Sequence, residues 1–422
     1  MHWRIASNVG WMLLDRCAQV IAGIGIVAIL ARTLGTDGFA AFQYAQSLVL
    51  IGASVALVCG GEVVVPRLVA VADAVAQHRL LAHVFRLRLL ASCCGYLLIC
   101  CFLAVSAHAH DSWQPALILG IAILLREPSG VVIAWTQAHT RTRPTVLISL
   151  VSLALKAGAV IMLAAAGIHA VGAYATAFVL EPLLAAILLA AFYRGHMPRH
   201  AVAFDRQLAR QLFRDGSLFW ISFMMMMAAR RVDQLILRPH VPSAEFASYA
   251  AAMQIVDNYT TLATILASGI APLYVYSRDA AVGIRNVLKL AIFSTVVGAA
   301  GAAVLVLLAP WIVHLLYGAA FAEAGSLLRL TALASPLIFA DVGFTVLAVY
   351  LRRPAWIAVK WGLALLATVA VDLALIPRYG ALGAILGYTA GNVLAMLTGL
   401  WMWRQARKPR GTIASEADVS SG

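Results

Sequence analysis

The chain has 422 residues, 63% of them hydrophobic and only 12% charged, and its mean hydropathy is +0.90. Stretches of about 20 apolar residues, the length that crosses a bilayer as a helix, recur from end to end. This composition excludes a soluble domain and predicts an all-α polytopic membrane protein. The formal charge of +13 indicates basic cytoplasmic loops rather than a nucleic-acid surface.

Twelve segments have the length and apolarity of membrane-spanning helices. The first lacks the uninterrupted apolar core and small-residue cleavage site of a signal peptide, so we expect a retained span. The segments are 9–31, 39–62, 84–106, 116–138, 145–167, 171–193, 217–238, 246–273, 286–309, 327–350, 355–376 and 380–403.

The distribution of Lys and Arg between alternate connections predicts the orientation. With a cytoplasmic N-terminus, the connections on that side collect 22 of the 31 Lys and Arg residues, and five more lie within spans. The opposite side has only Arg32, Arg238, Arg329 and Arg378. Because cytoplasmic loops carry the excess of basic residues, we expect both termini in the cytoplasm.

The longest cytoplasmic connection divides the chain into two halves. We expect a six-helix lobe over 1–193, a cytoplasmic linker over 194–216, a second lobe over 217–403 and a polar, disordered cytoplasmic tail over 404–422. In the linker, Phe204, Leu208 and Leu212 recur every fourth residue, with arginines between them. This spacing fits either an amphipathic helix on an anionic membrane surface or an ordinary basic linker.

Two weak internal matches support a duplication. RTLGTDGFAAFQYA (32–45) resembles RPHVPSAEFASYAAA (238–252), with Phe39 and Phe246 separated by 207 positions. VGAYATA (171–177) resembles LGAILGYTA (382–390) at a separation of 211. Six spans per unit make the repeats parallel, and transporters built from repeats bind substrate between the halves near the midplane.

Five cations lie at the depth of the predicted spans. They are Arg16, Arg126, Lys156, Arg230 and Arg231. A charge at the bilayer centre costs roughly 2.5–3.5 kcal/mol on insertion scales. Intramembrane ionisable residues generally face a cavity or a partner rather than lipid, which makes these five candidates for a functional site.

Two interpretations of these charges stay open: a basic, water-filled cavity between the halves, or ion pairs that only position helices. Arg230 and Asp233 are three residues apart and would share a helix face, so we expect them to pair. Arg231 points about 100° away on a regular helix and is expected to lack a partner. Arginine and lysine bind phosphate oxygens, so a basic cavity predicts an anionic, phosphate-bearing substrate.

Two of the predicted spans pair an acid with a proline, at Glu127–Pro128 and Glu181–Pro182. A proline frees a backbone carbonyl that lines a cation path in some transporters, although a simple packing kink explains the same pattern. No Walker, GxSxG or HExxH motif occurs. The sequence predicts no catalytic residues and no metal site, and hence a protein that is not an enzyme.

Three stretches carry a resemblance to a known family. They are ARTLGTDGFAAFQYAQSLV (31–49), ARRVDQLIL (229–237) followed by FASYAAAMQIVD (246–257), and LLYGAAFAEAGSLLRL (315–330) with LIPRYGALGAILGYTAG (375–391). In this order they resemble motifs of the polysaccharide repeat-unit flippases. That family is the lipid-linked oligosaccharide branch of the multidrug/oligosaccharidyl-lipid/polysaccharide exporter superfamily. Two positions depart from those motifs: Ala40 stands where the family usually has Gly after the Phe, and Ile385 stands where it usually has a second Ala.

The resemblance implies two six-helix lobes in a V around a central cationic cavity. The implied activity is movement of an undecaprenyl-pyrophosphate-linked oligosaccharide across the bacterial inner membrane, for O-antigen, capsule or exopolysaccharide. The five cations would then attract the pyrophosphate while the lipid tail stays in the bilayer. Membrane lipids and the polysaccharide polymerase and ligase machinery are the implied partners.

Three acids are candidates for H⁺ or Na⁺ coupling on the same reading: Glu127, Asp233 and Asp257. A carboxylate exchanges its charge state as the lobes rock. A multidrug exporter of this fold is an alternative, which the excess of buried cations disfavours. A membrane polysaccharide polymerase or ligase is a further alternative, disfavoured by the short outer connections.

Overall fold

Every regular element in the described part of the chain is a helix. The computed structural model describes residues 2–71, 73–106, 110–197, 202–275 and 279–407. The helices are α1 (His2–Ala56), α2 (Gly61–Ala70), α3 (Ala74–Val105), α4 (His110–Ala138), α5 (Arg143–Ala165), α6 (Val171–His196), α7 (Arg206–Ala229), α8 (Val232–Leu237), α9 (Ser243–Tyr274), α10 (Ala280–Tyr317), the short 3₁₀ helix η1 (Ala319–Phe321), α11 (Ala322–Ala332), α12 (Ser335–Tyr350), α13 (Pro354–Tyr379) and α14 (Ala381–Arg407). The predicted tail lies outside the described residues beyond Arg407.

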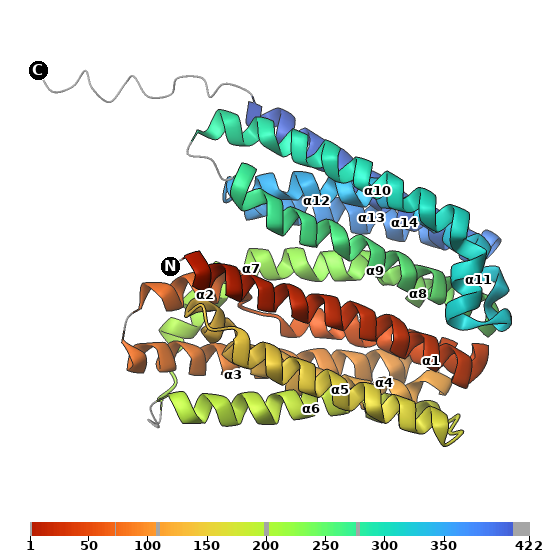
Figure 1. Cartoon of the computed structure of the whole chain (residues 1–422), viewed down its shortest axis with the longest axis horizontal. Helices are drawn as coiled ribbons and strands as arrows, with labels where there is room; N and C mark the ends of the chain where they lie inside the picture. The colour runs from red at the N-terminus through yellow and green to blue at the C-terminus, as the bar shows by residue number, and fades with distance from the viewer. Residues whose placement is uncertain (1, 72, 107–109, 198–201, 276–278, 408–422) are drawn as a thin grey trace, which may run out of the picture.

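Helix α1 contains the first two predicted spans, which join at Gly35. Gly35 has φ 66° and ψ −172°, a backbone conformation outside the helical region that glycine adopts without a Cβ clash. The chain crosses the bundle before Gly35 and returns after it, so that α2 lies at the same end as the start of α1 (Figure 1).

The seventh predicted span is broken at the two arginines. Helix α7 ends at Ala229 and α8 begins at Val232. Arg231 has φ −135°, and its N–H bonds to the Ala228 carbonyl, three residues back instead of four. The helical register is therefore lost between Arg230 and Arg231.

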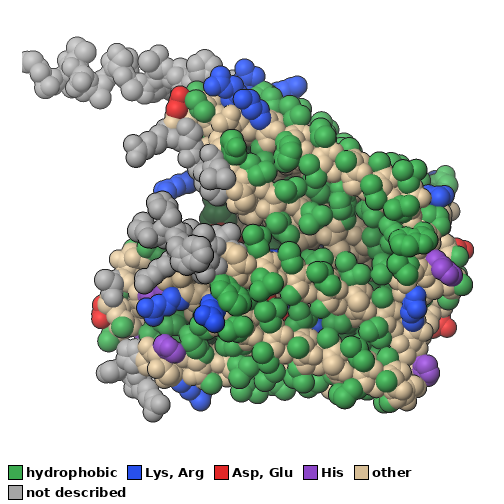
Figure 2. Space-filling view, in the orientation of Figure 1, with side chains coloured by type: hydrophobic (Ala, Val, Ile, Leu, Met, Phe, Trp, Pro, Cys, Tyr) green, Lys and Arg blue, Asp and Glu red, His purple; other side chains and the backbone are tan. Residues whose placement is uncertain are grey.

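The helices form two groups that follow the order of the chain. Helices α1 and α3 to α6 pack together, as do α7 and α9 to α14, and α1 joins the groups by packing on α9 and α7. A buried core crosses between them, with Tyr44 against Phe246 and Phe39 against Tyr317 and Phe321. At the end of the molecule opposite these aromatic contacts, where the chain starts, Figure 2 shows that the surface is hollowed between the two groups of helices.

The outer surface is suited to lipid. Large apolar side chains are exposed over most helices, such as Leu307 at 75% and Leu366 at 68%, and the face in Figure 2 is dominated by them. Eight described helices are long and apolar enough to span a membrane, or nine when α11 and α12 count as one bent span. This confirms the predicted all-α, multi-pass membrane protein; the count of twelve spans and the division into two lobes of six stay predictions.

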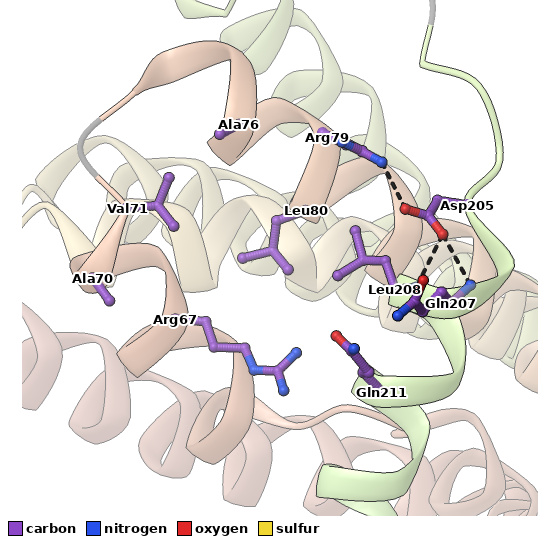
Figure 3. Close-up of a pocket in the computed structure, with 10 residues that line it drawn as sticks. All are labelled: Arg67, Ala70, Val71, Ala76, Arg79, Leu80, Asp205, Gln207, Leu208 and Gln211. Atoms are coloured by element: carbon purple, nitrogen blue, oxygen red, sulfur yellow. Dashed lines mark hydrogen bonds and ion pairs between the residues drawn. The ribbon is translucent and has the colours of Figure 1, made fainter.

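The predicted linker is not a separate helix. Helix α7 starts at Arg206 and continues through residue 216 into the predicted span. Its Leu212 is fully buried against α2 and α3, and Leu208 packs on the same cluster. The Asp205 carboxylate caps the helix and bonds the Arg79 guanidinium on α3 at 2.6 Å (Figure 3). The first turns of α7 thereby attach to the N-terminal group.

Candidate functional site

A polar cavity of about 280 Å³ lies inside the N-terminal group, between α1, α4, α5 and α6. Two of the five predicted cations, Arg16 and Arg126, line it. Its other charged residues are Asp15 and Glu181. We call it the basic cavity.

The two arginines of the basic cavity are not held in ion pairs within the described part of the chain. Within the described residues, neither Arg16 nor Arg126 has a carboxylate within 4.0 Å. Glu181 is paired with Lys156, the third predicted cation, and Asp15 accepts a hydrogen bond of 3.1 Å from Gln19. The other oxygen of Asp15 has no hydrogen-bond partner among the described residues, so this acid is only partly engaged, but it forms no ion pair with either arginine. The two guanidiniums therefore keep free donors with which they can bind an anion.

A second, smaller cavity lies between the two groups of helices. It measures about 90 Å³ and is lined by Gln43, Gln46 and Ser47 of α1 and by Arg231, Gln234 and Gln254 of the C-terminal half. Ser47 donates to Gln234 at 2.5 Å, a hydrogen bond that joins the halves. Its amide side chains make this cavity polar, whereas Arg231 is its one charged lining residue.

The expected pairing in the seventh span is wrong. Arg231, predicted to lack a partner, donates to Asp257 at 2.7 Å, with side chains 17% and 14% exposed. Asp233 accepts from the Tyr249 hydroxyl and from the Gln234 N–H instead of pairing with Arg230. The reason is the helix break, since the expected i, i+3 geometry requires a continuous helix. Arg230 has no ion pair among the described residues and lines neither cavity.

The five cations therefore do not surround one cavity. Arg16 and Arg126, with Lys156 behind Glu181, belong to the basic cavity, and Arg231 to the cavity between the halves. Glu127 does not line the basic cavity although Arg126 does, because successive residues of a helix point about 100° apart. The Glu127 carbonyl accepts a 3.3 Å hydrogen bond from Arg88.

Two buried cations escaped prediction because they lie near the ends of spans, where basic residues are ordinary. Arg88 is 4% exposed and donates to the carbonyls of Val58, Cys59 and Glu127. Lys360 is 1% exposed and bonds both Asp341 oxygens, at 2.8 and 2.9 Å. Both belong to the 22 basic residues that the sequence assigns to the cytoplasmic side, and in the structure both hold helices together.

A buried acidic pair lies in the C-terminal half. Asp372 of α13 is fully buried, and neither of its carboxylate oxygens has a hydrogen-bond partner. It is close enough to Asp233 to interact electrostatically. An ionised carboxylate without a partner is costly to bury, so Asp372 requires a proton or a bound cation. Asp233 was predicted as a coupling residue, and Asp372 was not singled out from the other acids.

A pocket of about 530 Å³ at the junction of α2, α3 and α7 is a poorer anion site (Figure 3). Its arginines are already neutralised, Arg67 by Asp215 and Arg79 by Asp205. These two ion pairs attach the start of α7 to α2 and α3. The basic cavity remains the stronger candidate.

The overall fold matches solved transporter structures. An inward-facing multidrug resistance MATE family transporter of the MOP superfamily has a TM-score of 0.71 and 14% identity, covering 93% of this chain and 96% of its own. Lipid II flippase MurJ in an inward closed conformation has a TM-score of 0.67 and 14% identity, covering 94% and 87%. At this identity the likeness shows the fold alone.

A third match is a MOP superfamily transporter from Pyrococcus furiosus, with a TM-score of 0.53 and 15% identity over 95% of this chain and 93% of its own. Its description states that the reverse polarity of its binding pocket suggests a different function. A search of curated proteins gave no significant match.

The sequence itself identifies the family. Residues 12–326 match the model of the polysaccharide biosynthesis protein family, which covers both cavities and the broken seventh span. The resemblance inferred from the motifs is confirmed: the chain belongs to the polysaccharide biosynthesis protein family and has the fold of MOP-superfamily transporters.

Proposed function

We propose that this protein is a flippase that moves undecaprenyl-pyrophosphate-linked oligosaccharide repeat units across the bacterial inner membrane for surface polysaccharide synthesis. The carrying observation is the basic cavity, in which Arg16 and Arg126 form no ion pair with a carboxylate among the described residues. The family and the transporter fold support the same function. Both termini would be cytoplasmic, and the polymerase and ligase machinery would receive the product.

The chemistry of the head group explains the choice of residues. A pyrophosphate is a compact anion, and each guanidinium offers it paired donors in a planar fork. Lys156 holds Glu181 and so prevents that acid from neutralising the arginines. The oligosaccharide, rich in hydroxyls, would then lie toward the amide-lined cavity between the halves, near Arg231.

Coupling to H⁺ or Na⁺ is assigned to the acids of the C-terminal half. Asp372 and Asp233 form the pair there that can exchange a proton or small cation. Asp257 neutralises Arg231, so its carboxylate is already engaged in an ion pair. Glu127, like Asp233 and Asp372, lines neither cavity, and it stays a second candidate for the coupling site. Binding and release of the cation would bias the rocking of the two groups.

Deletion of the gene, followed by analysis of lipid-linked glycans, tests the function. We expect loss of surface polysaccharide, with lipid-linked repeat units trapped on the cytoplasmic face. Complementation with Arg16→Gln or Arg126→Gln should lower transport about tenfold or more, because each removes a charge-assisted contact of about 1.5–3 kcal/mol. The exposed Arg378→Gln is the matched control and should restore transport fully.

The opposite results are equally defined. Normal polysaccharide in the deletion strain, together with lost drug resistance, would identify a multidrug exporter of the same fold. Full transport by Arg16→Gln and Arg126→Gln at normal expression would remove the head-group role from these residues.

A further inference from the structure

An apolar groove lies on the membrane-facing side of α3, α4 and α6. It measures about 440 Å³, within the range of small-molecule pockets of roughly 300–1,000 Å³. Its walls are apolar, including Phe85, Leu125 and Ala186, and its few polar side chains gather mainly at one end. That end carries Tyr193 and Arg194, about 12 Å along α6 from Ala186 at 1.5 Å per residue.

The groove and the basic cavity lie on opposite sides of one wall, formed by α4 and α6. On α4, Arg126 and Ile133 face the cavity, whereas Leu125 and Val132 face the groove. Ser129 lines both. The small Ser129 side chain therefore borders the basic cavity on one side and the apolar groove on the other.

Near Ser129, the wall contains alanines on α6 and a proline in each of its two helices. Ala185 faces the cavity and Ala186 faces the groove, and each of the two helices carries a proline there, Pro128 and Pro182. Proline removes a backbone hydrogen bond and weakens the helix locally. Nearer the predicted cytoplasmic end, rings close the wall, with Trp135 of α4 packed edge-on against Tyr193 of α6 at 6.2 Å.

We propose that this groove binds the polyprenyl chain of the lipid-linked substrate, while the pyrophosphate occupies the basic cavity across the α4–α6 wall. The inference rests on the proposed function and names where the lipid part of that substrate lies. The two parts of the substrate meet beside Ser129.

A polyprenyl pyrophosphate fits this arrangement better than a phospholipid does. Its single chain is attached directly to the anionic group, which matches one groove next to one basic cavity. A phospholipid carries two chains below a phosphate at the interface, which does not match a single groove separated from a basic cavity by one side chain, Ser129. Because the bilayer is as apolar as the groove, the groove contributes packing and orientation rather than a hydrophobic driving force.

Binding to the purified full chain tests the proposal, with undecaprenyl pyrophosphate and inorganic pyrophosphate as separate probes in native mass spectrometry. Ala186→Trp and Leu125→Trp fill the groove and should weaken undecaprenyl pyrophosphate about tenfold or more, with inorganic pyrophosphate unchanged. Arg126→Gln should weaken both probes. Leu366→Trp, on the exposed face of α13, is the matched control and should change neither.

A photo-crosslinker at position 85 keeps the test independent of bulky substitutions. Phe85 is 43% exposed on the groove, so benzoylphenylalanine there leaves the fold intact. Crosslinking to undecaprenyl pyrophosphate should be competed by excess unlabelled compound and not by phosphatidylglycerol. Equal competition by phosphatidylglycerol would make this an ordinary lipid site and overturn the proposal, as would unchanged affinity in both groove variants. If the deletion strain instead keeps its polysaccharide, the proposed function fails, whereas this binding experiment still reads out the groove.

Discussion

The ion pair between Arg231 and Asp257 is the residue-scale feature that carries the first prediction. Asp257→Asn leaves the mostly buried Arg231 guanidinium without its partner. It should therefore lower the stability more than the double substitution Arg231→Gln/Asp257→Asn does. Removing one partner of a fully buried ion pair lowers the free energy of unfolding by about 3–5 kcal/mol. The partial exposure of this pair makes the expected loss smaller. Thermal unfolding of the four proteins in one detergent gives the coupling, expected at about 1–3 kcal/mol.

Strict additivity of the two single substitutions in that cycle would contradict the pairing. Lys360 and Asp341 supply a fully buried comparison, at 2.8 Å and 1% side-chain exposure for the lysine. Lys360→Met should therefore destabilise the protein more than Asp257→Asn does.

The residue scale is also where prediction from sequence succeeds least. The insertion cost correctly marks Arg230 and Arg231 as needing an explanation. A helical wheel then pairs Asp233 with Arg230, because the sequence does not predict the helix break. In the broken helix, Arg231 pairs with Asp257 instead. Partners far apart in the chain, such as Lys156 and Glu181, depend on how helices pack, which a single sequence does not encode.

At the scale of elements, the turn at Gly35 sets the geometry of α1. Its φ of 66° costs roughly 1–2 kcal/mol for a residue with a Cβ, although no atom lies within 4 Å of the Cβ position. Gly35→Ala should therefore destabilise by about that amount. Gly25→Ala, also with open space around it but within the helical part of α1, should be neutral or stabilising by about 0.5–1 kcal/mol. Equal unfolding temperatures for the two variants would contradict the strained turn.

The start of α7 should loosen in acid. Hydrogen bonds from the backbone N–H groups of Leu208 and Gln207, with the Arg79 guanidinium, lower the pKa of Asp205 below its ordinary value. A lowered pKa means that this cap stabilises the helix start above about pH 4 and is lost as the pH falls through the lowered value. Hydrogen-exchange protection of Gln207 and Leu208 should fall in that window.

Asp205→Asn is the control for this pH dependence, because asparagine also caps a helix but carries no titrating charge. Protection in that variant should not change with pH once intrinsic exchange rates are divided out. A parallel fall in both proteins would show that some other group controls the docking of α7.

At the scale of the whole molecule, composition and hydropathy predict the fold class, whereas at the residue scale they do not predict the ion pairs. Apolar segment length predicts the membrane class, and Gly35 falls in the predicted connection between the first two spans. The Arg230–Arg231 break, by contrast, falls inside a segment that hydropathy alone treats as a simple span. The repeated Phe39 and Phe246 motifs are both fully buried, and Tyr44 packs on Phe246 where the halves join. The closed end and the hollowed end belong to one conformation, whereas the sequence has to be compatible with every conformation that the protein adopts, so hydropathy alone does not predict which end is closed.

The closed end yields the last prediction. Arg32 of α1 donates to the carbonyls of Leu315 and Leu316, at 2.5 and 3.0 Å, where α10 ends in the other group of helices. In the proposed flippase, alternating access would require these contacts to break during each cycle. A hydrogen bond to a charged group is worth about 1.5–3 kcal/mol, and less where it is exposed as here. Arg32→Ala should therefore raise the population separated at this end roughly fivefold to tenfold.

Double electron–electron resonance between spin labels at positions 37 and 323 measures this separation. The labels are attached to cysteines introduced into a variant that lacks the six native cysteines. Both side chains are exposed, and one lies in each group. Arg329→Ala is the matched control, since Arg329 bonds the Val306 carbonyl at 3.2 Å within the C-terminal group alone. It should leave the distance distribution unchanged. An Arg32→Ala distribution identical to that of the unmodified chain would mean that the aromatic contacts of Phe39 with Tyr317 and Phe321 hold this end closed without the arginine.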